Sequence, residues 1–255
     1  MCRCGSTLGE HVLHEEEAMA ATPTVVLVHG AFADASGYAG VIRILQAEGI
    51  EVRAPMNPLR GVVSDADAVT RYTTTIEGPI LLVGHSYGGA VISHAAPNVR
   101  GVTGLVFLSA FGLDIGESCA SVGEPFPAPL LASANIPTPY DAPGAVGGPD
   151  LFIKIDQFHE AFCADLPDEV AGPMAVSQRP ISAAAFTEAA TVAGWRDLPT
   201  WYMVSAQDQA IAPEAEQFMA KRMEAVTETV QGSHAAFIAQ PDVAAGLILK
   251  AVAAA

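Results

Sequence analysis

Basic residues are scarce in this chain of 255 residues. Its 12 lysines and arginines stand against 28 aspartates and glutamates, which leaves a net charge of −16. A surface of this sign repels nucleic acid and anionic lipid headgroups, and it favours solubility. We therefore expect no nucleic-acid partner and no membrane partner, and we expect a monomer or a homodimer.

Long hydrophobic runs and a disulfide framework are also missing. No apolar run reaches the roughly 18 residues that a membrane-spanning helix needs, although 51% of the residues are hydrophobic and can supply a large core. The four cysteines are Cys2, Cys4, Cys119 and Cys163. Their scattered positions indicate a reducing compartment, and we expect a cytoplasmic protein.

Residues 1–18 lack helical or strand periodicity. They also lack the basic region and the long apolar region of a signal peptide. Cys2 and Cys4, with His11 and His14, could in principle bind a metal, but an unstructured leader fits this composition better. We interpret residues 1–18 as a disordered or extraneous extension and residues 19–255 as one domain.

Short apolar runs alternate with helical segments from residue 24 onward. This alternation predicts an α/β fold with a mostly parallel, doubly wound sheet, whose functional groups lie at the carboxyl ends of the strands. The predicted strands are 24–28, 50–55, 80–83, 102–109, 200–205 and 225–230, and the predicted helices include 38–48, 65–76, 90–96 and 241–255.

The alternation stops between residues 112 and 195, where prolines and glycines are frequent and helical segments are predicted at 151–164, 168–177 and 182–190. We expect a small helical cap, inserted after the strand at 102–109 and without a core of its own. Aromatic side chains in the cap and the first loop are candidates for a substrate pocket, although each also suits packing of the cap on the domain. They are Phe32, Phe126, Phe152, Phe158, Phe162 and Trp195.

A Gly-x-Ser-x-Gly turn occupies residues 84–88. A predicted strand precedes it and a predicted helix follows it, which is the order found in a nucleophile elbow. The turn forces the backbone of Ser86 into a strained conformation, so side chains at positions 84, 88 or 89 are expected to collide with a neighbouring strand or helix. The Ser86 hydroxyl would then lie at a helix N-terminus, where the helix dipole favours developing negative charge.

A serine hydroxyl needs a base before it can act as a nucleophile. His234 is the predicted base, because it lies in a short loop between the last predicted strand and the terminal helix. His94 lies within the elbow helix and His159 within a predicted cap helix, so neither is placed at the end of a strand.

The base in turn needs an acid that orients it. Asp208 directly follows the predicted strand at 200–205, and we predict that it accepts a hydrogen bond from Nδ1 of His234. Asp114, just beyond the strand at 102–109, is the alternative acid. Asp197 precedes its strand and therefore lies at the wrong end of the sheet.

Two backbone N–H groups are expected to stabilise an oxyanion. One belongs to Tyr87, the residue after the serine. The other belongs to the loop after the first strand, where Gly30 permits a close approach to the elbow. Ala31 is the expected donor in that loop, and Phe32 is the alternative. This chemistry needs neither a metal nor a cofactor, and we expect none.

These motifs resemble those of the α/β-hydrolases, from about residue 24 to the C-terminus, in the branch of the plant methylesterases and hydroxynitrile lyases. The matching elements are residues 29–31, residues 84–89, Asp208 ahead of a helix that begins at Pro213, and residues 233–241. Hydroxynitrile lyases of this branch carry a lysine after the catalytic histidine, where this chain has Ala235. Epoxide hydrolases and dehalogenases use an aspartate where it has Ser86.

The resemblance implies a cofactor-free serine hydrolase that acts on small or medium-sized carboxylic esters through an acyl-enzyme on Ser86. The alternatives are a lactone hydrolase, a C–C bond hydrolase or a perhydrolase with the same catalytic residues. A ligand-binding, receptor-like protein with slow turnover is a further alternative. The expected partner is a small-molecule ester.

Overall fold

Six strands form one parallel sheet in the order β2-β1-β3-β4-β8-β9 in the computed structural model, which describes residue 1, residues 21–140 and residues 148–255. The strands are β1 (Thr24–Val28), β2 (Val52–Arg53), β3 (Ile80–His85), β4 (Val102–Leu108), β8 (Thr200–Ser205) and β9 (Val226–Val230). The predicted mostly parallel α/β fold is confirmed. Residues 2–18 of the predicted extension, with Cys2, Cys4, His11 and His14, lie outside the described residues.

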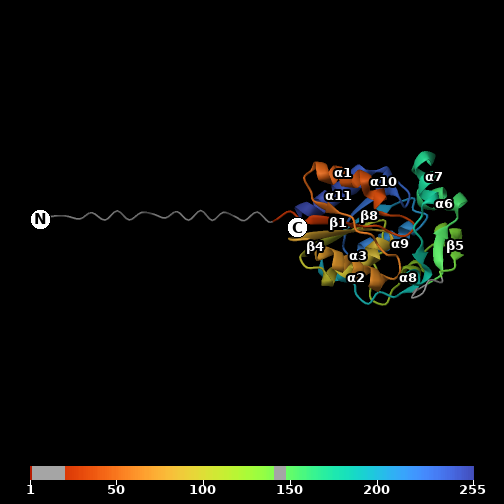
Figure 1. Ribbon diagram of the computed structural model, residues 1–255, viewed down its shortest axis with the longest axis horizontal. Coiled ribbons are helices and arrows are strands. Elements are labelled where there is room, and N and C mark those ends of the chain that lie inside the picture. Colours follow the sequence, from red (N-terminus) through yellow and green to blue (C-terminus); the bar gives the residue numbers. More distant parts are fainter. Residues whose placement is uncertain (2–20, 141–147) are drawn as a thin grey trace.

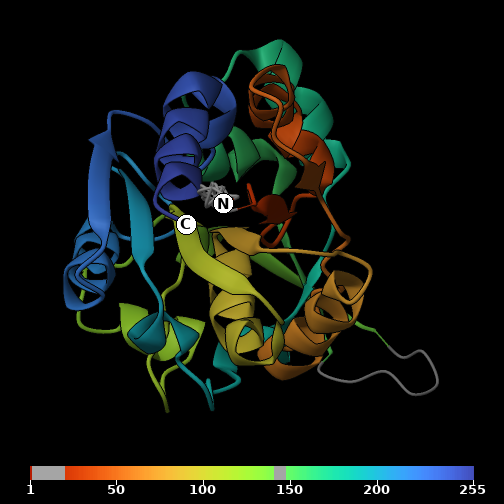
Figure 2. The same cartoon turned by 90° about the vertical axis from the view of Figure 1, so that its left-hand side faces the viewer.

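Helices cover both faces of this sheet, as Figures 1 and 2 show. Helices α1 (Ala39–Ala47) and α11 (Pro241–Ala253) lie on one face, and α2 (Val62–Thr73) and α3 (Tyr87–Ala95) lie on the other. All five residues of β1 are buried, because a parallel sheet between two helical layers faces no water. Within the described part of the chain, every helix is too short or too polar to cross a lipid bilayer.

The core consists of two hydrophobic clusters, one on each face of the sheet. Val25 and Leu27 of β1 point into the cluster beneath α1 and α11, whereas Val26 and Val28 point into the cluster beneath α2 and α3. This alternation follows from the two-residue period of a strand. Helix α9 (Pro213–Arg222), which begins at a proline as predicted, packs against β8 and contributes to the second cluster.

The residues between β4 and β8 form the cap, to which β5, α6 and α7 of Figure 1 belong. Its elements are α4 (Cys119–Gly123), α5 (Leu131–Ala134), β5 (Asn135–Thr138), β6 (Asp150–Ile153), α6 (Ile155–Phe162), α7 (Asp168–Val176), β7 (Ile181–Ser182) and α8 (Ala183–Thr187). Residues 141–147 of the predicted cap lie outside the described residues.

The cap contains a three-stranded antiparallel sheet, β5-β6-β7, that the sequence analysis did not predict. The predicted helix at 151–164 is wrong at its start, because residues 151–153 pair with 135–137 as a strand. A run of four residues is too short for periodicity to separate a strand from the start of a helix. Buried cap residues such as Ile153, Phe158 and Phe162 belong to the same hydrophobic cluster as the sheet.

Candidate active site

Ser86 lies at the sharp turn between β3 and α3, with φ 54° and ψ −127°. A non-glycine residue with positive φ is strained and persists only where its surroundings fix it. The backbone of Ser86 is fixed on both sides, since its N–H donates to the carbonyl of Leu108 (3.2 Å) and its carbonyl accepts from the N–H of Phe111 (3.1 Å). The predicted elbow geometry is confirmed.

The glycines around Ser86 are required by close packing of backbone. A Cβ on Gly84 would lie 2.5 Å from the carbonyl oxygen of Gly88, and a Cβ on Gly88 would lie 2.3 Å from that of Val28. A Cβ on Gly89 would lie 2.8 Å from the Cβ of Ala110. The predicted collisions at positions 84, 88 and 89 are therefore confirmed, and these contacts hold the elbow against β1 and the loop after β4.

His234 and Asp208 form a buried hydrogen-bonded pair. Nδ1 of His234 lies 2.6 Å from Oδ2 of Asp208, and each residue is 1% exposed. Oδ1 of Asp208 accepts the backbone N–H groups of Ala210 (2.6 Å) and Ile211 (2.9 Å). The carboxylate therefore accepts the Nδ1–H of the imidazole, which leaves Nε2 as the free acceptor of the ring.

The imidazole of His234 lies directly beside the elbow. Its ring centroid is 4.6 Å from that of His85, the residue before Ser86, and Nε2 of His85 donates to the carbonyl of His234 (2.9 Å). Burial holds the pKa of His85 well below its usual value, so His85 is a neutral spacer between the elbow and the His234 loop. Within the described chain, the hydroxyl of Ser86 makes no hydrogen bond to another side chain, His234 included.

Asp165, from the cap, fixes the loop that carries His234. One oxygen of its carboxylate accepts the N–H of Ser233 (3.0 Å), and the other accepts the hydroxyl of Ser233. Gly232 allows this approach, because a Cβ there would lie 2.8 Å from the Asp165 carboxylate. Asp165 was not predicted from the sequence, because it stands in a loop 68 residues from Ser233 with no motif around it.

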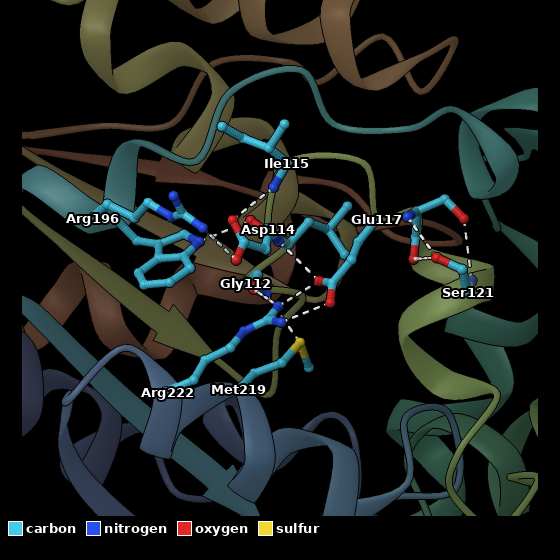
Figure 3. Close-up of polar contacts among 11 residues, drawn as sticks. Gly112, Asp114, Ile115, Glu117, Ser121, Arg196, Met219 and Arg222 are labelled. Atoms are coloured by element: carbon cyan, nitrogen blue, oxygen red, sulfur yellow. Dashed lines mark hydrogen bonds and ion pairs between the residues drawn. The ribbon is translucent and has the colours of Figure 1, made fainter.

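Asp114, the alternative acid, takes part in a separate ion-pair network that Figure 3 shows. Its carboxylate accepts from Arg196 (2.7 Å) and from the backbone N–H of Ile115 (2.7 Å). The neighbouring Glu117 forms a second ion pair with Arg222. The structure thus brings Asp208 to His234 and directs Asp114 to an arginine.

The loop after β1 approaches the elbow at Gly30, where a Cβ would lie 2.6 Å from the Cβ of Ser86. The N–H of Phe32 donates to the carbonyl of Arg179 (3.0 Å), so it is already committed. This geometry favours Ala31 over Phe32 as the donor of the loop. The other expected donor, Tyr87, begins α3, and its hydroxyl donates to Asp65 (2.8 Å), which fixes its side chain.

Asn57, which was not among the residues predicted from the sequence, holds the same loop in place. Its side-chain amide donates to the carbonyl of His29 (2.9 Å), and its backbone N–H donates to Nε2 of His29 (3.0 Å). Burial lowers the pKa of His29, so the ring is neutral and can accept this bond. The signal that could have identified Asn57 in the sequence is its position a few residues beyond the end of a strand of the parallel sheet, β2.

A cavity of about 560 Å³ lies between the cap and the loop after Asp208. Its apolar wall includes Phe111, Phe126 and Ile211. Phe111 is bonded through its backbone to Ser86, and Ile211 through its backbone to Asp208. The cavity is therefore lined by hydrogen-bonding neighbours of the predicted nucleophile and the predicted acid, whereas Ser86, Asp208 and His234 do not line it themselves.

The other aromatic candidates occupy different places. Phe32 and Phe162 line a smaller cavity of about 170 Å³, and Phe162 also packs edge-on against the His234 ring (5.1 Å between centroids). Phe158 is fully buried, and Phe152 lies on β6 without lining either cavity. Trp195 lies outside both cavities and donates its indole N–H to the carbonyl of Leu113 (2.8 Å).

Comparison with known proteins gives matches along most of the chain. Residues 25–247 match the model of the alpha/beta hydrolase family. The chain is 28% identical over 215 residues to Probable hydrolase R7 of Phoma sp., covering 75% of this chain and 80% of that protein. It is 28% identical over 236 residues to the pyrethroid hydrolase of Sphingobium wenxiniae, covering 86% and 83%. A methylesterase structure from Arabidopsis has the same fold, with a TM-score of 0.74 at 16% identity over 91% of this chain and 99% of the other.

Replacing Gly88 by alanine is expected to lower the free energy of unfolding by about 3 kcal/mol, because the new methyl group would overlap the carbonyl of Val28. Gly246→Ala is the control, since a Cβ there meets nothing within 4 Å on α11. That substitution is expected to raise the free energy of unfolding by about 0.5–1 kcal/mol. Urea denaturation followed by circular dichroism measures both, and equal stability of Gly88→Ala and the wild type would contradict the close-packing argument.

Proposed function

Because the chain belongs to the alpha/beta hydrolase family, we propose that it is a cofactor-free serine esterase that cleaves carboxylic esters of small or medium size. The observation that carries this proposal is the buried contact between Nδ1 of His234 and Asp208, 2.6 Å long, beside a strained serine at a helix N-terminus. A base oriented by an acid and a serine on an elbow are what acyl transfer to a hydroxyl needs.

In the proposed reaction, Nε2 of His234 takes the proton of the Ser86 hydroxyl as its oxygen attacks the ester carbonyl. The serine–imidazole hydrogen bond of such sites often tightens only when substrate binds. The N–H groups of Ala31 and Tyr87 stabilise the oxyanion, and His234 then protonates the leaving alkoxide. Water, activated by the same imidazole, releases the acid from Ser86. Asp208 keeps the Nδ1–H tautomer and stabilises the imidazolium that forms at each step.

The apolar cavity favours esters in which one side is a hydrophobic group. Its volume of about 560 Å³ suits a chain or ring of medium size, and its lining includes Phe111, Phe126 and Ile211. The likeness to a pyrethroid hydrolase at 28% identity agrees with an apolar substrate. Lactones and aryl esters would use the same groups.

Ser86→Ala is expected to abolish the release of p-nitrophenol from p-nitrophenyl butyrate, because no acyl-enzyme can form without the hydroxyl. The wild type should show a burst with an amplitude equal to the enzyme concentration if deacylation is slower than acylation. Stopped-flow absorbance measures both phases. A wild type that binds the ester but releases no more product than Ser86→Ala would identify a ligand-binding protein instead.

Asp208→Asn is expected to lower kcat by on the order of 10²–10⁴, because the amide does not hold the imidazole in the correct tautomer. Asp114→Asn is the matched control and should keep kcat near that of the wild type, since Asp114 pairs with Arg196 and not with His234. Steady-state kinetics on purified variants that give the wild-type circular dichroism spectrum provide the measurement. A large loss in Asp114→Asn with little loss in Asp208→Asn would reverse the assignment of the acid.

A further inference from the structure

Glu216 is a fully buried acidic residue in the first turn of α9, directly behind Asp208. The first turn of a helix is a common place for glutamate, because the helix dipole favours negative charge there. Glu214, two residues earlier on the same helix, fits that description and is exposed. Glu216 is 0% exposed, so the helix dipole alone does not account for it.

The contacts of Glu216 leave one of its oxygens without a donor. Oε2 accepts the backbone N–H of Ser205 at 3.0 Å. Oε1 is buried and has no donor among the described residues. The carboxyl groups of Glu216 and Asp208 lie close enough to form a hydrogen bond when one of them carries a proton. Two ionised carboxylates in such contact, both shielded from water, would repel each other strongly. A proton between them turns the repulsion into a hydrogen bond.

We propose that Glu216 is a neutral carboxylic acid whose O–H donates to Asp208, and that this bond positions Asp208 against His234. Glu216 is then a positioning residue, one step behind the acid of the proposed catalytic residues, and this role rests on the proposed esterase function. The hydrogen bond fixes the Asp208 side chain without adding a second negative charge beside the imidazole.

The shared proton belongs to Glu216 because the two carboxyl groups have unequal donors. Asp208 accepts from the N–H groups of Ala210 and Ile211 and from His234, three donors that stabilise a carboxylate. Glu216 accepts only from the N–H of Ser205. Burial, and then the charge of Asp208, raise the pKa of Glu216 well above its usual value.

The other groups packed around Glu216 do not supply a proton or a counter-charge. Tyr202, below it on β8, donates its hydroxyl to the carbonyl of Ala110. The hydroxyl of Ser205 is paired with that of Ser109 at 2.7 Å. No lysine or arginine of the described residues forms an ion pair with Glu216, and the imidazole of His234 is paired with Asp208.

A neutral Glu216 makes folding take up one proton, because the same side chain is ionised in the unfolded chain above its ordinary pKa. The stability that the protonated group contributes is fully present below that ordinary pKa and is lost as the pH rises. In Glu216→Gln the amide reproduces both bonds, since its oxygen accepts from Ser205 and its NH₂ donates to Asp208. No proton is taken up in that variant.

The protonation state is tested on the free protein, with no substrate. The equilibrium constant for unfolding of the wild type, divided by that of Glu216→Gln, should rise by about tenfold per pH unit once the pH exceeds the ordinary pKa of a glutamate. The infrared spectrum of the wild type minus that of the variant should contain the C=O band of a neutral carboxylic acid at pH 7. Glu214→Gln is the matched control and should show neither effect. A flat ratio together with no such band would overturn the proposal.

The positioning role is tested by the kinetics of Glu216→Leu and Glu216→Gln on p-nitrophenyl butyrate. Leucine removes the donor, and kcat should fall on the order of 10- to 100-fold with little change in KM, because a misplaced Asp208 affects the transition state more than substrate binding. Glutamine should recover most of that loss.

The outcomes separate this proposal from the proposed function. A wild type with the acid band and no esterase activity would refute the function and leave the protonation standing. If the wild type shows the acid band but Glu216→Leu keeps the full kcat, the positioning role is overturned. If Glu216→Leu does not fold, the comparison of Glu216→Gln with the wild type still tests the proposal. A loss of kcat in the glutamine variant would mean that a negative charge is needed at this position, which would overturn the proposal.

Discussion

The buried pair of His234 and Asp208 requires hydrogen-bond partners, and the surrounding loops supply them. A carboxylate 1% exposed is stable only if its oxygens are fully bonded, and the backbone N–H groups of Ala210 and Ile211 supply what the imidazole does not. Both amides come from the turn between β8 and α9, which is why the acid follows that strand directly. The parallel sheet then places this turn beside the loop after β9, since the two strands are neighbours in register.

Two neutral histidines, His85 and His29, hold the loops around the candidate site in place. His85 spaces the elbow from the His234 loop, and His29 anchors the loop that carries Ala31. Burial lowers the pKa of both rings, so each serves as a hydrogen-bonding group without introducing positive charge next to His234. One imidazole is thus paired with a carboxylate, whereas the other two serve as neutral hydrogen-bonding groups. Environment distinguishes three chemically identical side chains.

Much of the fold and the core of the candidate site could be predicted from the sequence, because the relevant signals are local. Runs of buried β-branched residues identify β1 and β3, and the spacing of the glycines identifies the turn at Ser86. Other features depend on contacts between distant residues. The pairing of Asp114 with Arg196 spans 82 positions, and the strand β5 contains Pro137 and reads as a loop. Glu216 looks like an ordinary first-turn glutamate until the structure shows that it is buried behind Asp208.

The contact between Asp165 and Ser233 has a consequence for how such proteins diversify. The cap shares its hydrophobic cluster with the sheet and also holds the loop of the base through a carboxylate. A cap of this kind is not an exchangeable module, because grafting a foreign one would release the histidine loop along with the cap side of the cavity. In the proposed esterase, a change of substrate preference is then more accessible through single substitutions in the cavity lining, around Phe126 and Ile211, than through exchange of the whole cap.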